Sequence, residues 1–195
     1  MTQNRSHHKM VEQRLYSSKG GKMQEEWRTI REFPEYEISN YGRVAHKAQD
    51  ILIRTSHTLQ GGLKVGLTEN GKQYTRSVKV LVADAFVDGK SPHFNTPIIL
   101  DGDQNNCSAQ NLMWRPRWFA WHYTNQFKNV LDIYRKGPIV EVDQYGDILE
   151  VYMDTYEVGI TFGLQFYEVW SCLNSPYDKK PVFPTGQFFD WPNKV

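Results

Sequence analysis

A chain of 195 residues with 39% hydrophobic and 14% aromatic side chains can build one domain or two small ones, so global disorder is excluded. No apolar run is long enough to cross a bilayer and no signal peptide opens the chain, so we expect no membrane partner and no signal-directed secretion. Cys107 and Cys172 lie far apart, which argues against a disulfide framework or a cysteine zinc site and fits a reducing compartment.

The formal net charge of +1 is unevenly distributed along the chain, and it divides the sequence into three predicted segments. Residues 1–22 carry a charge of +4 and end in two glycines, which is typical of a flexible basic arm. Residues 23–136 carry +3, and residues 137–195 carry −6. We expect the second and third segments to be separate folded parts with different partners.

The first folded segment opens with β signals and ends in a helix. A short strand at residues 37–39 enters a turn in which Asn40 and Gly42 suit left-handed backbone conformations. Asn70-Gly71 lies between two alternating runs, which predicts a hairpin with strands near residues 63–67 and 73–78. Apolar residues at helical spacing predict a helix over residues 80–86.

Two stretches of this segment resemble a known family. The run IILDGDQNNCSAQNLMW, residues 98–114, is similar to the centre of HNH nucleases of the kind carried by phages and mobile introns. The pattern of residues 25–44, with Phe33-Pro34, Ile38-Ser39-Asn40 and Gly42, resembles the modular motif found N-terminal to such nucleases. The resemblance implies an HNH-like ββα core, preceded by a β-rich module.

In this family the resemblance implies a general-base His at the end of a strand with a metal ligand beside it. Ile98 and Ile99 occupy those two positions here, and Lys79 stands where a second His is usual. Neither isoleucine can bind a hard cation or accept a proton, so we expect no catalytic residue, no metal and no cofactor. The Asp-Gly-Asp turn and the Asn pair have structural reasons to persist, and Asn111 is expected to cap a following helix.

An active nuclease remains an alternative, in which a displaced residue replaces the missing base. In that case His122 and Asn106 would be catalytic, and Asp101, Asp103 and His122 would hold Mg²⁺. A surface or interface histidine is the simpler interpretation of His122, because a ligand without a partner is weak support for a metal site.

Basic and aromatic residues alternate after Trp114. Arg115, Arg117 and Lys128 are the candidate DNA contacts, because cations neutralise phosphates. Trp118 and Trp121 are candidate protein contacts, since tryptophan is a common interface anchor. The sequence does not separate nucleic-acid binding from protein binding here.

The acidic segment predicts a hairpin of residues 139–142 and 148–152, then a helix that Thr155 caps and that runs to about Phe162, where Gly163 ends it. A second helix is expected over residues 165–173, followed by a terminal strand in TGQFFDW. This order resembles a second nuclease-associated modular motif, which binds DNA through a helix-turn-helix. No Lys or Arg lies between residues 137 and 178, so we expect a protein interface through Phe166, Tyr167 and Trp170 instead.

Taken as one molecule, the sequence predicts an α+β protein with an HNH-like ββα core, an N-terminal β-rich module and a C-terminal β-hairpin plus helix-turn-helix module. The favoured hypothesis is a repurposed, nuclease-inactive phage protein that binds a protein assembly, in the virion or in the host cytoplasm. The alternatives are an active metal-dependent HNH endonuclease and a DNA-binding regulator that contacts nucleic acid through the basic arm and the central segment.

Overall fold

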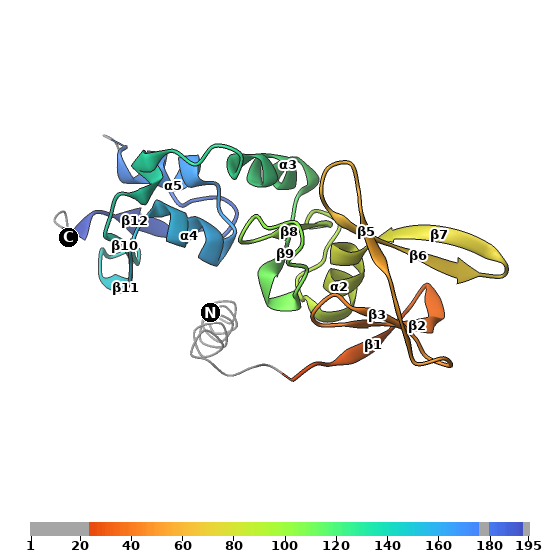
Figure 1. Ribbon diagram of the computed structural model, residues 1–195. Coiled ribbons are helices and arrows are strands. Elements are labelled where there is room, and N and C mark those ends of the chain that lie inside the picture. The colour runs from red at the N-terminus through yellow and green to blue at the C-terminus, as the bar shows by residue number, and fades with distance from the viewer. Residues whose placement is uncertain (1–23, 176–179, 193–195) are drawn as a thin grey trace. The chain divides into compact units, whose positions relative to one another are not determined.

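The computed structural model describes residues 24–175 and 180–192, and the predicted basic arm lies outside the described residues. These residues form two compact units (Figure 1). One unit holds the described residues up to Val87 together with residues 107–110, and the other holds residues 88–106 and the described residues from Asn111 onward. Among the described residues no helix is long and apolar enough to cross a membrane.

The described residues of the first unit form two antiparallel sheets and helix α2 (Val78–Phe86). Strands β1 (Trp27–Ile30), β2 (Phe33–Ser39), β3 (Val44–His46) and β4 (Ile51–Ile53) follow in that order in one sheet. Strands β5 (Thr55–His57), β6 (Leu63–Glu69) and β7 (Lys72–Ser77) form the other, and helix α2 packs against strands of both. The predicted hairpin is confirmed: Asn70 and Gly71 both have positive φ, as a two-residue turn between twisted strands requires.

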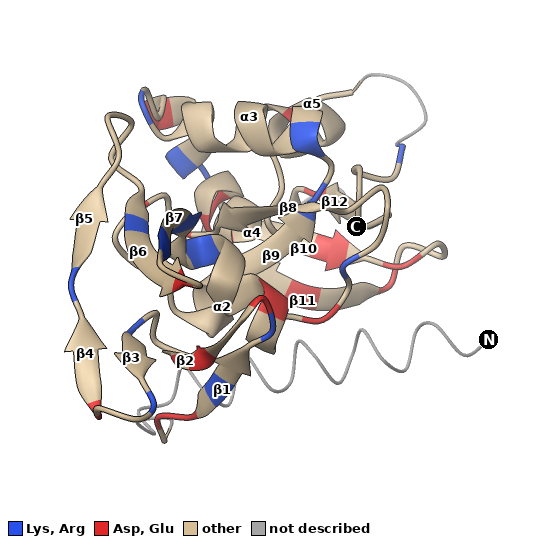
Figure 2. Ribbon diagram, turned by 90° about the vertical axis from the view of Figure 1, so that its right-hand side faces the viewer, with Lys and Arg blue, Asp and Glu red and all other residues tan. Residues whose placement is uncertain are grey.

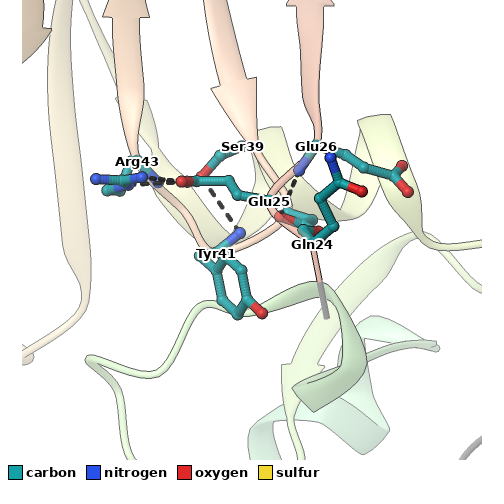
Figure 3. A network of polar contacts seen from close by, with 7 residues as sticks. Gln24, Glu25, Glu26, Ser39, Tyr41 and Arg43 are labelled. Atoms are coloured by element: carbon teal, nitrogen blue, oxygen red, sulfur yellow. Dashed lines mark hydrogen bonds and ion pairs between the residues drawn. The ribbon is translucent and has the colours of Figure 1, made fainter. Parts of the chain in front are cut away.

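The turn after β2 is held by a polar network. Ser39 Oγ accepts hydrogen bonds from the backbone N–H groups of Tyr41 and Arg43, and the Arg43 guanidinium binds Glu25 (Figure 3). Gly42 has the expected positive φ, but Asn40 does not. The Asn40 side chain instead accepts from Glu26 N and donates to the carbonyl of Gln24, which joins the turn to the residues before β1.

The second unit begins with a hairpin and a helix. Strands β8 (Thr96–Ile99) and β9 (Leu112–Arg115) are antiparallel, with Ile98 opposite Met113 and Ile99 opposite Leu112. Helix α3 (Arg117–Gln126) follows β9 and packs on β8. A short 3-10 helix, η1 (Ala109–Asn111), leads into β9, so the prediction that Asn111 caps a helix is wrong, because a strand follows it.

The acidic segment completes this unit. Strands β10 (Ile139–Val142), β11 (Ile148–Tyr152) and β12 (Phe188–Asp190) form a sheet in the order β11-β10-β12, and another 3-10 helix, η2 (Asp132–Arg135), precedes it. Helices α4 (Thr155–Phe162) and α5 (Phe166–Leu173) confirm the predicted helix pair, with Gly163 in the left-handed region between them. Asp154, not Thr155, caps α4, since its carboxylate accepts from Glu157 N.

The α+β fold class is therefore confirmed, including the β-rich start, the ββα arrangement and the hairpin plus helix pair. The structural division differs from the predicted one at residue 137, because the β8–β9 hairpin and α3 belong to the same unit as the acidic segment. The physical reason is a shared interior: Phe127 and Tyr134, which precede residue 137, contact the ring of Phe166 at centroid distances of 5.4 and 5.8 Å. The three-segment division stays a prediction about function and charge.

Candidate functional site

The end of β8 is where an HNH-like site would lie, and it is apolar. Ile98 and Ile99 are 0% and 3% exposed. Ile98 and Leu100 form a buried cluster with three residues that α3 turns inward, namely Phe119, Ala120 and Tyr123. Met113 and Phe127 close the cluster from its edges. Apart from the Tyr123 hydroxyl, the side chains that line this space are aliphatic or aromatic carbon and offer a divalent cation no carboxylate or imidazole ligand.

Tyr123 supplies the polar atom in this cluster, and that atom is occupied. Its hydroxyl donates to the carbonyl of Leu100 at 2.8 Å and lies 3.3 Å from the carbonyl of Gly159 on α4. The phenol therefore ties α3 both to the end of β8 and to the helix pair. A buried hydroxyl held in this way stabilises the fold and leaves no free group for chemistry.

The helix pair packs directly on this cluster at Gly163. A methyl group in place of its hydrogen would stand 3.0 Å from Ile98 Cδ1 and 3.2 Å from Met113 Sδ. Glycine is thus required twice here, by its φ of 61° and by the close approach of the β8–β9 hairpin. The turn between α4 and α5 therefore packs tightly against the end of β8 and against β9.

Arg115 was predicted to contact DNA, and the structure argues against that role. Its side chain is buried at 5% exposure, and its guanidinium donates to the carbonyls of Phe162 at 2.5 Å and Gly163 at 3.3 Å. These two carbonyls end α4 and have no partner within the helix, so Arg115 satisfies them and complements the negative end of the helix dipole. Arg115 is therefore a structural residue of this unit.

The acidic and amide residues after β8 hold the loop together. Asp101 accepts through Oδ1 from Asp103 N at 2.9 Å and from Asn111 Nδ2 at 2.9 Å, and through Oδ2 from Asn106 Nδ2 at 2.7 Å. Asn111 also donates to the carbonyl of Asn106 and accepts from Asp101 N. Asp103 in turn accepts from the backbone and side chain of Asn105. These side chains do the work of loop closure, as expected from the sequence.

His122 is not brought to this loop. It is exposed on α3, where its ring lies edge-on to Trp121 at 4.9 Å. Across residues 24–175 and 180–192, no three His, Cys, Asp or Glu side chains are grouped so that they could hold a metal. The fallback set of Asp101, Asp103, His122 and Asn106 therefore does not form one site in the structure.

Lys79, at the other position where the family pattern has a His, lies in the first turn of α2 and is half-buried. Burial lowers the pKa of its ammonium group, and the nearby Cys107 opposes this shift. Cys107 and Cys172 are both buried, and no disulfide joins them.

The remaining predicted contacts divide into exposed and buried residues. Arg117 and Lys128 are exposed, as are Trp118, Trp121 and Tyr167 at 58%, 66% and 64%. Phe166 is buried at 1% exposure beneath a cluster of rings, which argues against its predicted place in an interface. Trp170 is half-buried, edge-on to Trp191.

The β10–β11 hairpin carries several Asp and Glu residues (Figure 2). Tyr152 donates to Glu141 Oε2 at 3.2 Å, and Gln187 donates to Glu141 Oε1 at 2.8 Å. Burial raises the pKa of the Tyr152 phenol, and the neighbouring Glu141 raises it further. β11 is an edge strand whose apolar side chains face outward, with Ile148, Leu149 and Val151 each half exposed or more.

Sequence reasoning missed the inward face of α3 and the contacts of Arg115 and Gly163. A signal for the first was present, because Phe119, Tyr123 and Phe127 recur at every fourth position and so share one helix face. The role of Arg115 had no local signal, since its partners lie 47 and 48 residues away.

Comparison with known proteins finds a matching sequence motif and similar HNH endonucleases. Residues 25–74 match the NUMOD4 motif. Two curated relatives, both from Acanthamoeba polyphaga mimivirus, are the uncharacterised HNH endonucleases L247 and L245. They are 32% identical over 83 residues and 33% identical over 133 residues, or 43% and 67% of this chain. The chain spans 21% and 37% of their lengths.

Among solved structures, the HNH homing endonuclease I-HmuI, described in a study of DNA binding and cleavage, aligns with a TM-score of 0.47 and 24% sequence identity. The alignment covers 85% of this chain and 97% of that one. The chain thus carries a NUMOD4 motif at residues 25–74 and is similar in sequence to HNH endonucleases.

Proposed function

We propose that this chain is a non-cleaving member of the HNH endonuclease family. It binds a protein partner and does not hydrolyse DNA. The observation that carries the proposal is the buried cluster of Ile98, Leu100, Phe119, Ala120 and Tyr123 at the end of β8. An HNH nuclease needs a general base and a divalent cation on its hairpin and helix, and this cluster supplies neither.

The expected rate losses favour a complete loss of DNA cleavage over a weakened enzyme. Loss of a general base alone lowers the rate by about 10²- to 10⁴-fold. Here the ligand position beside it is also aliphatic, so the metal that would clamp the phosphate has no anchor there. His122 is exposed on α3 and does not take the place of the missing base. The Asp101 carboxylate, the proposed metal ligand, is already hydrogen-bonded to Asn106 and Asn111.

The acidic module supports a protein partner over DNA. Glu141, Asp143, Asp147 and Glu150 lie on or beside the β10–β11 hairpin, and this charge would repel a phosphate backbone. β11 presents an open edge, and its exposed apolar side chains extend to Tyr145 and Met153, which are 81% and 75% exposed. An exposed apolar edge strand suits contact with another polypeptide. The partner we propose is a protein assembly, such as a virion or a host or phage complex.

A plasmid-nicking assay tests the loss of cleavage. The full chain, in molar excess over supercoiled DNA, is incubated with Mg²⁺ or Mn²⁺ and compared with the His122→Ala variant. We expect both proteins to leave the plasmid supercoiled. Metal-dependent nicking that is lost in His122→Ala would refute the proposal and support an enzyme with a displaced histidine.

Site-specific photo-crosslinking tests the protein partner. A photoreactive amino acid replaces Val151 on β11 or, as a matched control, Leu59, which is fully exposed in the first unit. In the cells that naturally produce the chain, we expect position 151 to give a discrete protein adduct that position 59 does not give. Adducts to nucleic acid at position 151 would contradict this assignment.

A further inference from the structure

The outward face of α3 carries two exposed tryptophans that take no part in the function proposed above. Trp118 and Trp121 are 58% and 66% exposed. Trp118 stacks at 5.5 Å, with an interplanar angle of 26°, on Phe183, which is itself 47% exposed. Large rings left in water at successive positions of one helix face are a costly arrangement for a surface without a ligand.

The stretch of sequence that contains these rings carries charge of one sign. From Gln104 through Leu131 the sequence has three Lys or Arg residues and no Asp or Glu. Arg115 is buried, but Arg117 and Lys128 are exposed at the two ends of α3. Neither makes an ion pair with any residue that the structure describes. The face therefore combines flat rings with two cations that form no ion pair with any described residue.

These features fit single-stranded nucleic acid better than the other partners of a basic aromatic surface. A duplex keeps its base faces stacked inside, so exposed indole faces have nothing to stack on, whereas a single strand offers a π-face at every base. Insertion into a lipid surface calls for aliphatic side chains, but the exposed positions of α3 are Arg117, Trp118, Trp121 and His122. A basic protein segment would be repelled by Arg117 and Lys128.

We propose that the outward face of α3 binds single-stranded nucleic acid, with Trp118 and Trp121 stacking on bases while Arg117 and Lys128 contact the flanking phosphates. This site lies apart from the apolar cluster, on the opposite face of the same helix, where Phe119, Ala120 and Tyr123 are turned inward. Binding there needs no metal, so the inference stands or falls independently of the loss of cleavage.

Fluorescence anisotropy of the full chain with labelled twelve-residue dT and rU oligonucleotides tests the site, with a mixed-sequence duplex of the same length alongside. We expect either single strand to bind at least tenfold tighter than the duplex. Trp118→Ala and Trp121→Ala should each weaken binding about tenfold or more, because each stacked base contributes substantially to affinity. Arg117→Ala should reduce the dependence of log affinity on log salt by about 0.7.

Two further variants separate stacking from unfolding and from general charge. Tyr167→Ala removes an equally exposed ring from α5 and should change the affinity less than twofold. Trp121→Phe keeps a flat ring and should retain most of the binding that Trp121→Ala loses. The inference is overturned if no single strand binds, if the duplex binds as tightly, or if the tryptophan variants bind like Tyr167→Ala.

Discussion

The Ile98→Asn variant tests whether the end of β8 is a buried apolar interior or a site that can bind a metal. Ile98 is fully buried in the cluster with Leu100 and Phe119. Removal of the buried aliphatic side chain forfeits about 1.5–3 kcal/mol of transfer free energy. An amide left without partners costs about 1–3 kcal/mol more. The sum of about 2.5–6 kcal/mol is a large share of the roughly 5–15 kcal/mol by which a domain is stable.

Urea denaturation followed by circular dichroism, with and without Mn²⁺, measures this effect. Ile148→Asn is the matched control, because it makes the same change at a half-exposed position of β11 and should cost no more than about 1 kcal/mol. We expect Ile98→Asn to lower the urea midpoint far more than the control, and Mn²⁺ to restore nothing. A small effect at Ile98, or stabilisation by Mn²⁺, would refute the account of this cluster.

Three further predictions follow from contacts of named residues. Gly163→Ala should lower the free energy of unfolding by about 1–3 kcal/mol more than Gly146→Ala, because both glycines have a positive φ but only a side chain at position 163 meets neighbouring side chains. Equal urea midpoints would contradict this. Arg115→Ala should lower the free energy of unfolding in urea by about 3 kcal/mol, and Arg117→Ala should lower it by less than about 0.5 kcal/mol. Similar losses of stability in the two variants would mean that the buried guanidinium contributes nothing. Lys79→Met should raise stability at pH 7, and denaturation series from pH 7 to 10 should show this gain shrinking toward the unfolded-state pKa of about 10.4.

The sign of the Lys79 effect follows from proton linkage. Burial lowers the pKa of the folded-state ammonium, so between the folded and unfolded pKa values the unfolded chain binds more protons. Stability therefore rises with pH through that window and falls as pH drops through the folded pKa. Methionine removes the titration, so its advantage is largest where the folded lysine is charged. An advantage that is constant from pH 7 to 10 would show that the lysine is not desolvated.

Local patterns predicted most of the secondary structure because they act through neighbouring residues. Asn70-Gly71 fixes a tight hairpin through its own backbone preferences, and Gly163 ends α4 in the same way. Asn111 was misassigned as a helix cap because the element that follows it depends on distant pairing, whereas the predicted cap Thr155 lies one residue after the true cap, Asp154. Leu112 extends into a strand because it pairs with Ile99 thirteen residues earlier, and no local preference of the Asn-Leu-x-Trp run reveals this.

The sequence predicts that the general base is missing from the candidate site, but it does not predict which side chains fill the space. The sequence shows isoleucine at positions 98 and 99, and this suffices to expect no general base. It does not show what fills the space, because the packing of Tyr123 and Gly163 on the hairpin joins parts of the chain about 25 to 65 residues apart. Burial of Arg115 and Phe166 likewise follows from tertiary packing, which a basic or aromatic pattern alone does not report.

We propose that a buried apolar cluster stands where an HNH nuclease would hold its metal. Paramagnetic broadening by Mn²⁺ in an amide nuclear magnetic resonance spectrum of the full chain tests it most directly, since Mn²⁺ broadens signals near any site that it occupies. We predict no selective broadening at residues 96–106 or along α3 at millimolar Mn²⁺. Saturable broadening centred on Ile99, Asp101 and His122 would contradict the account.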